Sequence, residues 1–405
     1  MRHAPFWQEL IPKSRRQAYP RLKGQQTARV VVIGGGLTGA ACAAVFAAAG
    51  IDLVLVEAGL VGGGMTAGDP GVLREGFAGS FHAAVGDHGV RTSRAVSDTM
   101  RRGSLDFATA LRRYRIKCDL APQEIITFAP PATDAARALR RDYEARHAAG
   151  VEGVWLTPAI VARETSLESG GAIRTRGSVI DPYRACAGLL GLAAARGARI
   201  HERSLVRRVR ASSRHVDVVT EGGAIRAETV VVATAAAIQD LRGLRRHLRP
   251  EHAYGVVTDA LPAASRRQVG PRRALLEDGR EPGRLVRWLA DDRVLLHGGR
   301  QAEVPARTQD RALVQRTGQL MYEFSLLFPA VSGLQPSLSW AGLDADTADG
   351  LPLLGPHRNF PRHLFAFGSS RHGAGLPWVA ARLALRHFQG VAARADEALG
   401  FTRIL

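Results

Sequence analysis

The chain of 405 residues predicts an α/β protein in which a parallel sheet is assembled from separate parts of the sequence and a mainly antiparallel sheet is inserted into it. Three observations predict this fold class. A β-branched run at residues 30–33 leads through glycines into an alanine-rich segment, as a buried parallel strand leads into a helix. A second buried run follows much later, at residues 230–234. Residues 250–340 alternate apolar and polar side chains in short segments, which is typical of antiparallel strands.

The glycines after the first run have the spacing of a dinucleotide-binding turn. Gly34 allows a tight turn, Gly36 lets the backbone approach a pyrophosphate, and Gly39 lets the next helix pack closely on the strand. The helix that opens there, rich in alanine from Ala40 to Ala49, points its free N–H groups at the phosphates. The turn therefore predicts a nucleotide site.

The strand after this helix ends in an acidic residue. Residues 53–56 are apolar, and Glu57 and Ala58 follow them directly. A carboxylate at this distance from the glycines accepts hydrogen bonds from ribose hydroxyls. A glycine-rich turn without a ligand would explain the glycines but not Glu57. We therefore predict a Rossmann-like dinucleotide-binding domain.

The other elements follow from periodicity and from helix start and stop signals. Residues 62–72 are too rich in glycine for regular structure, so we expect a loop that can lie close to a ligand. Asp181 is expected to cap the helix that Pro182 begins. Helices are expected at 95–114, 134–149, 182–195 and 376–388, and strands at 199–201, 204–209, 215–220, 228–234, 293–299 and 364–368.

These elements predict a discontinuous nucleotide-binding domain with an inserted α+β domain. Residues 1–27 are expected to form an N-terminal arm. The expected segments of the nucleotide-binding domain are 28–80, 170–240 and 341–405, and those of the substrate domain are 81–169 and 241–340.

The net charge of +18 comes almost entirely from arginine, since the chain has only three lysines, Lys13, Lys23 and Lys117. No zinc-finger, RNP or helix-turn-helix pattern accompanies the charge, so we expect no nucleic-acid partner. Arginines on solvated helix faces explain it. Attraction of an anionic substrate or a membrane surface is the alternative.

Three cysteines far apart in the sequence, without a CxxC pair, fit a reducing compartment and argue against a metal site. No run reaches the length of a membrane span, and residues 1–20 lack the pattern of a signal peptide. We therefore expect a cytoplasmic protein with no integral membrane segment and no metal.

Further motifs recur in a fixed order along the chain. They are the glycine turn with Glu57, the loop Gly64-Met65-Thr66-Ala67-Gly68-Asp69-Pro70-Gly71, the helix start Ile180-Asp181-Pro182, the strand 228–234, Trp340-Ala341-Gly342, Asp349-Gly350-Leu351-Pro352, Phe367-Gly368, and His372-Gly373-Ala374-Gly375-Leu376. In this order they resemble the FAD-dependent oxidoreductases of the D-amino-acid oxidase and glycine/sarcosine oxidase family. The resemblance covers most of residues 28–392.

The resemblance implies FAD as the cofactor, with the C-terminal glycines as a second backbone approach to the flavin. In this family the loop 64–71 usually contains an Arg-Asn pair, which this chain lacks. No cysteine lies at 340–350, where some relatives attach their flavin, so we expect a non-covalent cofactor. The implied cofactor-binding residues are Gly34, Gly36, Leu37, Thr38, Gly39, Glu57, Ala58, Gly64, Met65, Thr66, Ala67, Ala233, Thr234, Gly342, Asp349, Gly368, His372, Gly373, Ala374, Gly375 and Leu376.

The resemblance also implies oxidation of the C–N bond of a small amine or amino acid. A hydride passes from carbon to flavin N5, and water hydrolyses the imine. Arg287 is the candidate for a carboxylate fork, with an ordinary surface arginine as the alternative. His372 is the candidate beside the flavin, with a packed histidine as the alternative. Asp349 in such a sequence more often orders a turn than acts as a base.

The electron acceptor is expected to be O2 or a quinone or other carrier. Sarcosine-oxidase-like relatives use a lysine near the flavin to assist O2, and this chain has none after Lys117. We therefore expect a dehydrogenase or a slow oxidase. Two other readings stay open: a flavin-binding protein with weak or lost catalysis, and an NAD(P)-linked dehydrogenase that uses only the N-terminal site.

Overall fold

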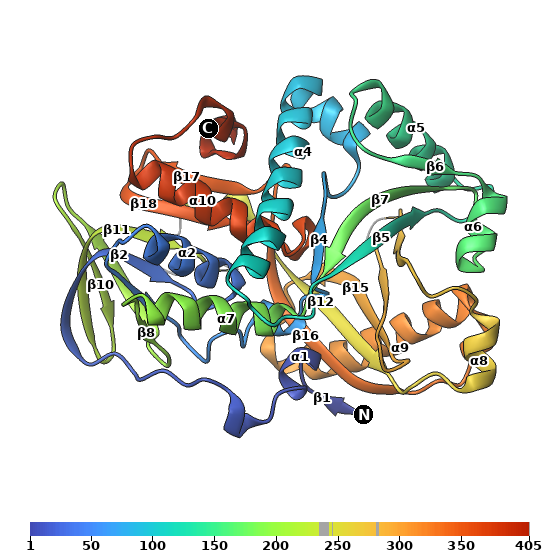
Figure 1. The fold of residues 1–405 in the computed structure, drawn as a ribbon, viewed down its shortest axis with the longest axis horizontal. Helices are drawn as coiled ribbons and strands as arrows, with labels where there is room; N and C mark the ends of the chain where they lie inside the picture. Colours follow the sequence, from blue (N-terminus) through green and yellow to red (C-terminus); the bar gives the residue numbers. More distant parts are fainter. Residues whose placement is uncertain (235–242, 245, 281–282, 405) are drawn as a thin grey trace.

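The structure is a computed structural model that describes residues 1–234, 243–244, 246–280 and 283–404. Two sheets lie side by side, and the long helix α4 (Phe81–Arg113) runs near the middle of the view in Figure 1. Within the described residues the smaller sheet has eight strands and the larger has ten. A parallel sheet combined with a mainly antiparallel one confirms the expected fold class.

Buried β-branched strands form the centre of the smaller sheet. β2 (Gly24–Ile33) lies between β3 (Leu53–Val56) and β11 (Gly223–Val232) and is parallel to both. β11 in turn is parallel to β18 (Phe360–Phe367). The carboxyl ends of all four strands therefore meet at one edge of the sheet. The other strands are β8 (Arg199–His201), β9 (Val206–Ala211), β10 (Val216–Thr220) and β17 (Leu353–His357).

Three helices cover one face of this sheet: α2 (Leu37–Ala48), α7 (Pro182–Ala195) and α10 (Leu376–Phe388). The alanines of α2 are nearly all buried, and their small side chains let α7 and α10 pack against it on either side. The predicted helices at 182–195 and 376–388 are confirmed.

Asp181 caps α7 as predicted, because its side chain accepts a hydrogen bond from the N–H of Arg184 at 2.9 Å. The residue is fully buried, and burial raises the pKa of its carboxyl to about 6. Its second oxygen makes no hydrogen bond within the described part of the chain. Keeping this carboxylate ionised in the folded protein therefore lowers the free energy of unfolding.

Replacing Asp181 by asparagine is expected to stabilise the protein increasingly as pH rises above about 4, with nearly the whole gain present above about pH 6, since asparagine keeps the cap and removes the charge. A raised pKa means that the folded state holds the proton more tightly than the unfolded chain, so wild-type stability falls as pH rises from about 4 to about 6. The gain in unfolding free energy is near zero at pH 4 and reaches about 3 kcal/mol above pH 7. Urea unfolding at both pH values measures it. The control is Asp134→Asn, at the exposed start of α5 (Asp134–Ala148), which should leave the free energy of unfolding unchanged at both pH values. If Asp181→Asn stabilised the protein at pH 4 as much as above pH 7, the buried charge would not be the cause.

The larger sheet is mostly antiparallel. β12 (Leu248–Thr258) lies between β15 (Val294–Ala302) and β16 (Pro336–Thr347) and is antiparallel to both. Two pairs in this sheet are parallel, β1 with β16 and β5 with β13. Its remaining strands are β1 (Arg2–His3), β4 (Val72–Arg74), β5 (Ala121–Phe128), β6 (Val154–Leu156), β7 (Ala172–Val179), β13 (Leu275–Asp278) and β14 (Leu285–Trp288).

One helix corrects the expectation that residues 250–340 form strands throughout. α9 (Gln309–Leu327) packs on β12, β15 and β16, and it buries Leu313, Leu320 and Phe324 at helical spacing. The helix expected at 95–114 begins earlier, at Phe81, and its backbone leaves helical geometry at Gly89, where φ is 78°. The remaining helices are α1 (Phe6–Glu9), α3 (Met65–Gly68), α6 (Pro158–Thr165) and α8 (Ala263–Gln268), with 3-10 turns η1 (Lys13–Arg15), η3 (Ala306–Thr308), η4 (Pro329–Val331), η5 (Ser370–His372), η6 (Arg394–Leu399) and η7 (Phe401–Ile404).

Some segments that were expected to belong to the nucleotide-binding domain contribute strands to the larger sheet. β4 and β7 lie within the expected nucleotide-binding segments 28–80 and 170–240, yet both pair in the larger sheet. The expected boundary between residues 240 and 241 lies outside the described residues. α3 forms one helical turn inside the loop that was expected to lack regular structure. None of the helices in the described ranges is both long and apolar enough to cross a membrane.

Candidate active site

A cavity of about 470 Å³ lies at the carboxyl ends of β2, β3, β11 and β18, and we call it the glycine-lined cavity. Both glycine turns singled out in the sequence line it, one after β2 and one before α10. The expected cofactor-binding residues that line it are Gly34, Gly36, Leu37, Thr38, Glu57, Ala58, Gly64, Met65, Thr66, Ala233, Thr234, Gly368, Gly373, Ala374 and Leu376.

The first turn can be made only by glycine at two positions. The φ of Gly34 is 110°, and a Cβ atom on it would lie 2.5 Å from the carbonyl oxygen of Ala233. A Cβ atom on Gly39 would overlap the carbonyl oxygen of Gly34. The backbone at the start of α2 therefore approaches β2 as closely as the sequence predicts. Thr66 adds to the turn, since its hydroxyl accepts the N–H of Leu37 at 2.8 Å.

Glu57 stands at the end of β3 with both carboxylate oxygens anchored. One accepts the N–H of Gly35 at 2.6 Å and the other that of Gly59 at 2.7 Å. Each oxygen keeps a further lone pair, and the residue lines the glycine-lined cavity. A carboxylate fixed in this way beside a glycine turn can accept from ligand hydroxyls.

The C-terminal turn reaches the same cavity from the other side. Gly373 has a φ of 78°, and a Cβ atom on it would lie 2.6 Å from the carbonyl oxygen of Val72. The N–H of Ala374 donates to that same oxygen at 2.8 Å. The turn is thus fastened to β4 just before α10 begins, and segments far apart in the chain enclose one ligand-sized space.

A family model described as FAD dependent oxidoreductase (DAO) matches residues 29–386. The chain belongs to this family. Gamma-glutamylputrescine oxidoreductase of Escherichia coli (strain K12) is 26% identical over 375 residues, 91% of this chain and 85% of that protein. Probable oxidoreductase OrdL of Rhizobium meliloti (strain 1021) is 23% identical over 350 residues, 83% of this chain and 77% of that protein.

Solved structures share the fold. Glycine oxidase from Geobacillus kaustophilus superposes with a TM-score of 0.77 at 22% identity, covering 93% of this chain and 99% of that one. L-Proline dehydrogenase from P. horikoshii gives a TM-score of 0.73 at 19% identity, covering 95% of this chain and 98% of that one.

The cofactor of this FAD-dependent oxidoreductase family is FAD, and the glycine-lined cavity fits it. The first turn of α2 presents N–H groups where a pyrophosphate belongs, and Glu57 stands where ribose hydroxyls belong. Side chains at Gly34 or Gly39 would displace the backbone of this cradle. The second turn, from Gly368 to Ala374, lines the remaining end.

Sequence reasoning missed several residues that line the glycine-lined cavity. Ser204, Leu205, Val206 and Arg207 follow β8, the strand next to β3, so they also lie at a carboxyl end in the smaller sheet. That position in a parallel sheet is a signal that could have identified them. Asp69 also lines the cavity, and burial raises the pKa of its carboxyl to about 6.

Other expected residues lie outside the lining of this cavity. Gly39 and Ala67 are buried behind it, and a Cβ atom on Gly342 or Gly375 would overlap the Met65 or Ser104 side chain. Gly342 and Gly375 thus allow close packing against these side chains. Asp349 forms an ion pair with Arg403 at 2.7 Å, and its carboxylate also accepts the N–H of Leu351 at 3.2 Å, as a turn-ordering residue does.

A second cavity of about 500 Å³ lies between α4, α5 and the larger sheet, and we call it the arginine-lined cavity. Ser370 lines both cavities. Every arginine in its described lining forms an ion pair with a carboxylate: Arg74 with Glu277, Arg146 with Asp142, Arg280 with Asp278, Arg284 with Glu323, Arg300 with Asp344 and Arg371 with Asp346.

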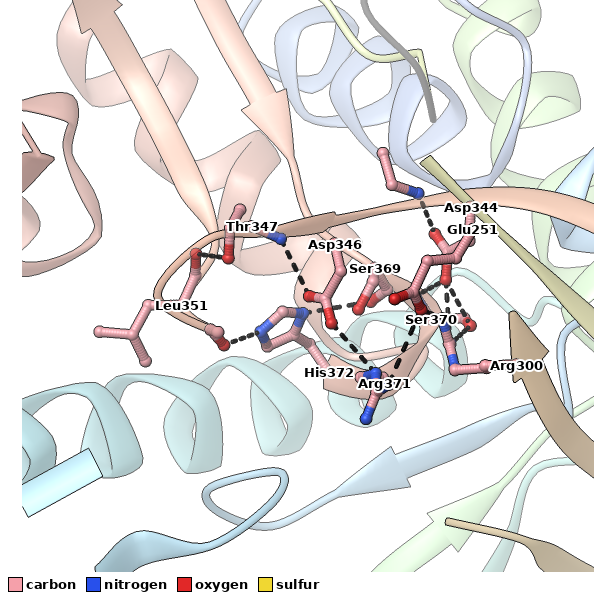
Figure 2. A network of polar contacts seen from close by, with 12 residues as sticks. Glu251, Arg300, Asp344, Asp346, Thr347, Leu351, Ser369, Ser370, Arg371 and His372 are labelled. Atoms are coloured by element: carbon pink, nitrogen blue, oxygen red, sulfur yellow. Dashed lines mark hydrogen bonds and ion pairs between the residues drawn. The ribbon is translucent and has the colours of Figure 1, made fainter. Parts of the chain in front are cut away.

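A polar network, drawn in Figure 2, includes Ser370, which lines both cavities, and we call this network the wall between them. Asp344 accepts from Arg300 at 3.0 Å and from both the N–H and the hydroxyl of Ser370 at 2.8 Å. Arg371 lies 3.1 Å from Asp346 and 3.7 Å from Glu251. Three carboxylates therefore surround two guanidinium groups at this wall.

His372 is part of this network in Figure 2 and lines the arginine-lined cavity. Its Nε2 is 2.9 Å from the carbonyl oxygen of Gly350, and its Nδ1 is 3.2 Å from that of Ser369. The ring therefore links the turn after β16 to the turn before α10.

Arg287 lies in the lining of neither cavity. Its guanidinium is buried over the ring of Trp7 and donates to the carbonyl oxygens of Pro70 at 2.5 Å and Ile180 at 2.9 Å. Burial lowers its pKa to about 10. The structure places this arginine as a support for the loop that lines the glycine-lined cavity, away from the space where a carboxylate was expected.

Among the described residues, no group of three or more His, Cys, Asp or Glu side chains is arranged to hold a metal ion.

Proposed function

We propose that this FAD-dependent oxidoreductase oxidises the C–N bond of a small amine, and that water then hydrolyses the imine product. Bound FAD supplies the acceptor for the hydride that leaves the carbon beside the nitrogen. One observation carries the proposal: the arginine-lined cavity adjoins the glycine-lined cavity at Ser370, so a substrate and the cofactor have neighbouring sites.

An amine fits the arginine-lined cavity better than an α-amino acid does. A substrate carboxylate needs a guanidinium fork, and each arginine of the described lining already faces a protein carboxylate. Drawing one away would leave a buried carboxylate unpaired, which costs about 3–5 kcal/mol. The name of the curated relative, gamma-glutamylputrescine oxidoreductase, agrees with an amine substrate. Oxidation of an amino acid, as in glycine oxidase, is the second candidate.

The protein side chains hold this arrangement in place. Asp344 and Arg300 fix Ser370 at the wall, and His372 fixes the turn that carries it. We propose that His372 is a positioning residue rather than one that exchanges protons, because both ring nitrogens lie against carbonyl oxygens.

Anaerobic bleaching of the bound flavin tests the function. Matched pairs that differ only in a carboxylate on the reacting carbon are compared: putrescine with ornithine, and benzylamine with phenylglycine. We expect at least one amine to bleach the flavin at least about tenfold faster than its amino-acid partner. Bleaching by amino acids alone would favour the second candidate. A flavin that no amine or amino acid reduces would leave only a binding protein.

We also propose a carrier other than O2 as the efficient electron acceptor, supported by the lack of lysine among the described residues that line either cavity. With the best amine, turnover with a quinone or dye should exceed turnover with O2, and fast, saturable peroxide formation would overturn this. We propose non-covalent FAD because no cysteine lines the described part of the glycine-lined cavity. A cytoplasmic location is proposed because Cys42, Cys118 and Cys186 are all free.

A further inference from the structure

His297 is a buried side chain of the arginine-lined cavity whose ring nitrogens find no hydrogen-bond partner among the described residues. It lies on β15, is 7% exposed, and makes no hydrogen bond to any described residue. Buried polar groups nearly always find partners, so a ring that lacks one in a ligand-sized cavity points to a ligand.

The strand directs the ring of His297 toward the cofactor side of the larger sheet. Side chains alternate along β15, so His297 shares a face with Leu295, which packs in one cluster with Trp340 and Ala67. Ala67 belongs to the loop that lines the glycine-lined cavity on its other side. The ring therefore faces the side of the larger sheet on which this loop lies, and it lines the arginine-lined cavity there.

The surroundings keep the ring neutral. The pKa of His297 is lowered to about 3, mainly by burial and also by the nearby Arg300, with Asp344 acting in the opposite direction. A neutral imidazole presents one acceptor nitrogen and one N–H. Its acceptor is uncharged and makes no hydrogen bond to a described residue, whereas carboxylates of the same lining such as Asp142 and Asp346 are paired with arginines, and Asp87, which forms no ion pair with a described residue, is exposed.

We propose that His297 binds the substrate by accepting a hydrogen bond from its amine nitrogen. The inference rests on the proposed function and adds the residue that selects the nitrogen. An amine held by one N–H has a fixed orientation, so the carbon beside it can be turned toward the glycine-lined cavity. A neutral acceptor achieves this without placing a second positive charge beside Arg300.

Replacement of the ring in the FAD-loaded enzyme tests this assignment. His297→Leu and His297→Met remove the acceptor, whereas His297→Gln keeps one. Binding is measured by the change in flavin absorbance with tert-butylamine, which has no hydrogen on the carbon bonded to nitrogen, and with the best amine of the bleaching screen. We expect the apolar variants to bind both amines at least about tenfold more weakly, with His297→Gln within about threefold of wild type.

The control is His363→Leu, a buried histidine on β18 that lines neither cavity in the described residues and should bind amines as wild type does. FAD content and thermal unfolding show whether each variant is folded and loaded with cofactor. Two apolar variants are made so that the test still stands if one of them fails to fold. Wild-type affinity in an intact apolar variant would overturn the assignment. A wild-type flavin that no amine perturbs or bleaches would instead refute the proposed function.

Discussion

Gly39→Ala is expected to yield a colourless protein that binds FAD at least about 100-fold more weakly than wild type. A Cβ atom on this residue would overlap the carbonyl oxygen of Gly34, and neither atom belongs to a flexible side chain. The first turn of α2 must therefore move away from β2, which removes the N–H groups from the pyrophosphate. The ratio of flavin to protein absorbance and calorimetric titration with FAD measure the loss.

Two other glycines separate this effect from general damage. Gly318→Ala, on the exposed face of α9 with open space around it, should leave FAD binding unchanged. Gly36→Ala meets only the Thr66 hydroxyl, 3.2 Å away, so that variant should fold and still bind FAD more weakly. A yellow Gly39→Ala protein with wild-type affinity would contradict the assignment of this turn.

Arg300→Met is expected to lower the free energy of unfolding by about 3–5 kcal/mol, because it leaves the buried carboxylate of Asp344 without its partner. The two side chains are 7% and 3% exposed, and their atoms lie 3.0 Å apart. Methionine fills most of the volume of the arginine side chain, so the loss of unfolding free energy reflects the missing charge and not a cavity. Urea unfolding of the apoprotein measures the change.

The double variant Arg300→Met/Asp344→Asn should recover most of this loss, because it removes both charges of the pair and leaves neither one buried without its partner. The matched control is Arg29→Met, whose ion pair with Glu228 is half-exposed on both sides; it should change stability by less than about 1 kcal/mol. Equal losses of unfolding free energy in Arg300→Met and Arg29→Met would show that burial does not determine how much each ion pair stabilises the protein.

Local signals in the sequence predicted the parts of the site that local geometry determines. The spacing of Gly34, Gly36 and Gly39, and Glu57 at the end of the next strand, needs only one βαβ unit. The Asp181 cap and the start of α10 at Leu376 are likewise set within one turn of helix. These elements lie where the sequence predicted them.

The arginine-lined cavity depends on pairings that no local pattern contains. Arg300 and Asp344 meet because β15 and β16 flank β12, and that register is fixed by the whole sheet. Arg287 was chosen by its neighbours along the chain, yet its guanidinium points to carbonyl groups contributed by distant loops. α9 was missed because alternation in the surrounding strands masked its own period of apolar residues.

The ion pairs inside the arginine-lined cavity divide the positive charge of the chain into two populations. Each guanidinium group lining that cavity is neutralised at close range by a carboxylate, whereas the surplus of +18 belongs to the rest of the chain, where many arginines are exposed. Ionic strength therefore acts on the two differently. Added salt weakens adhesion of the molecule to anionic surfaces, and the chemistry within proceeds in nearly the same electric field.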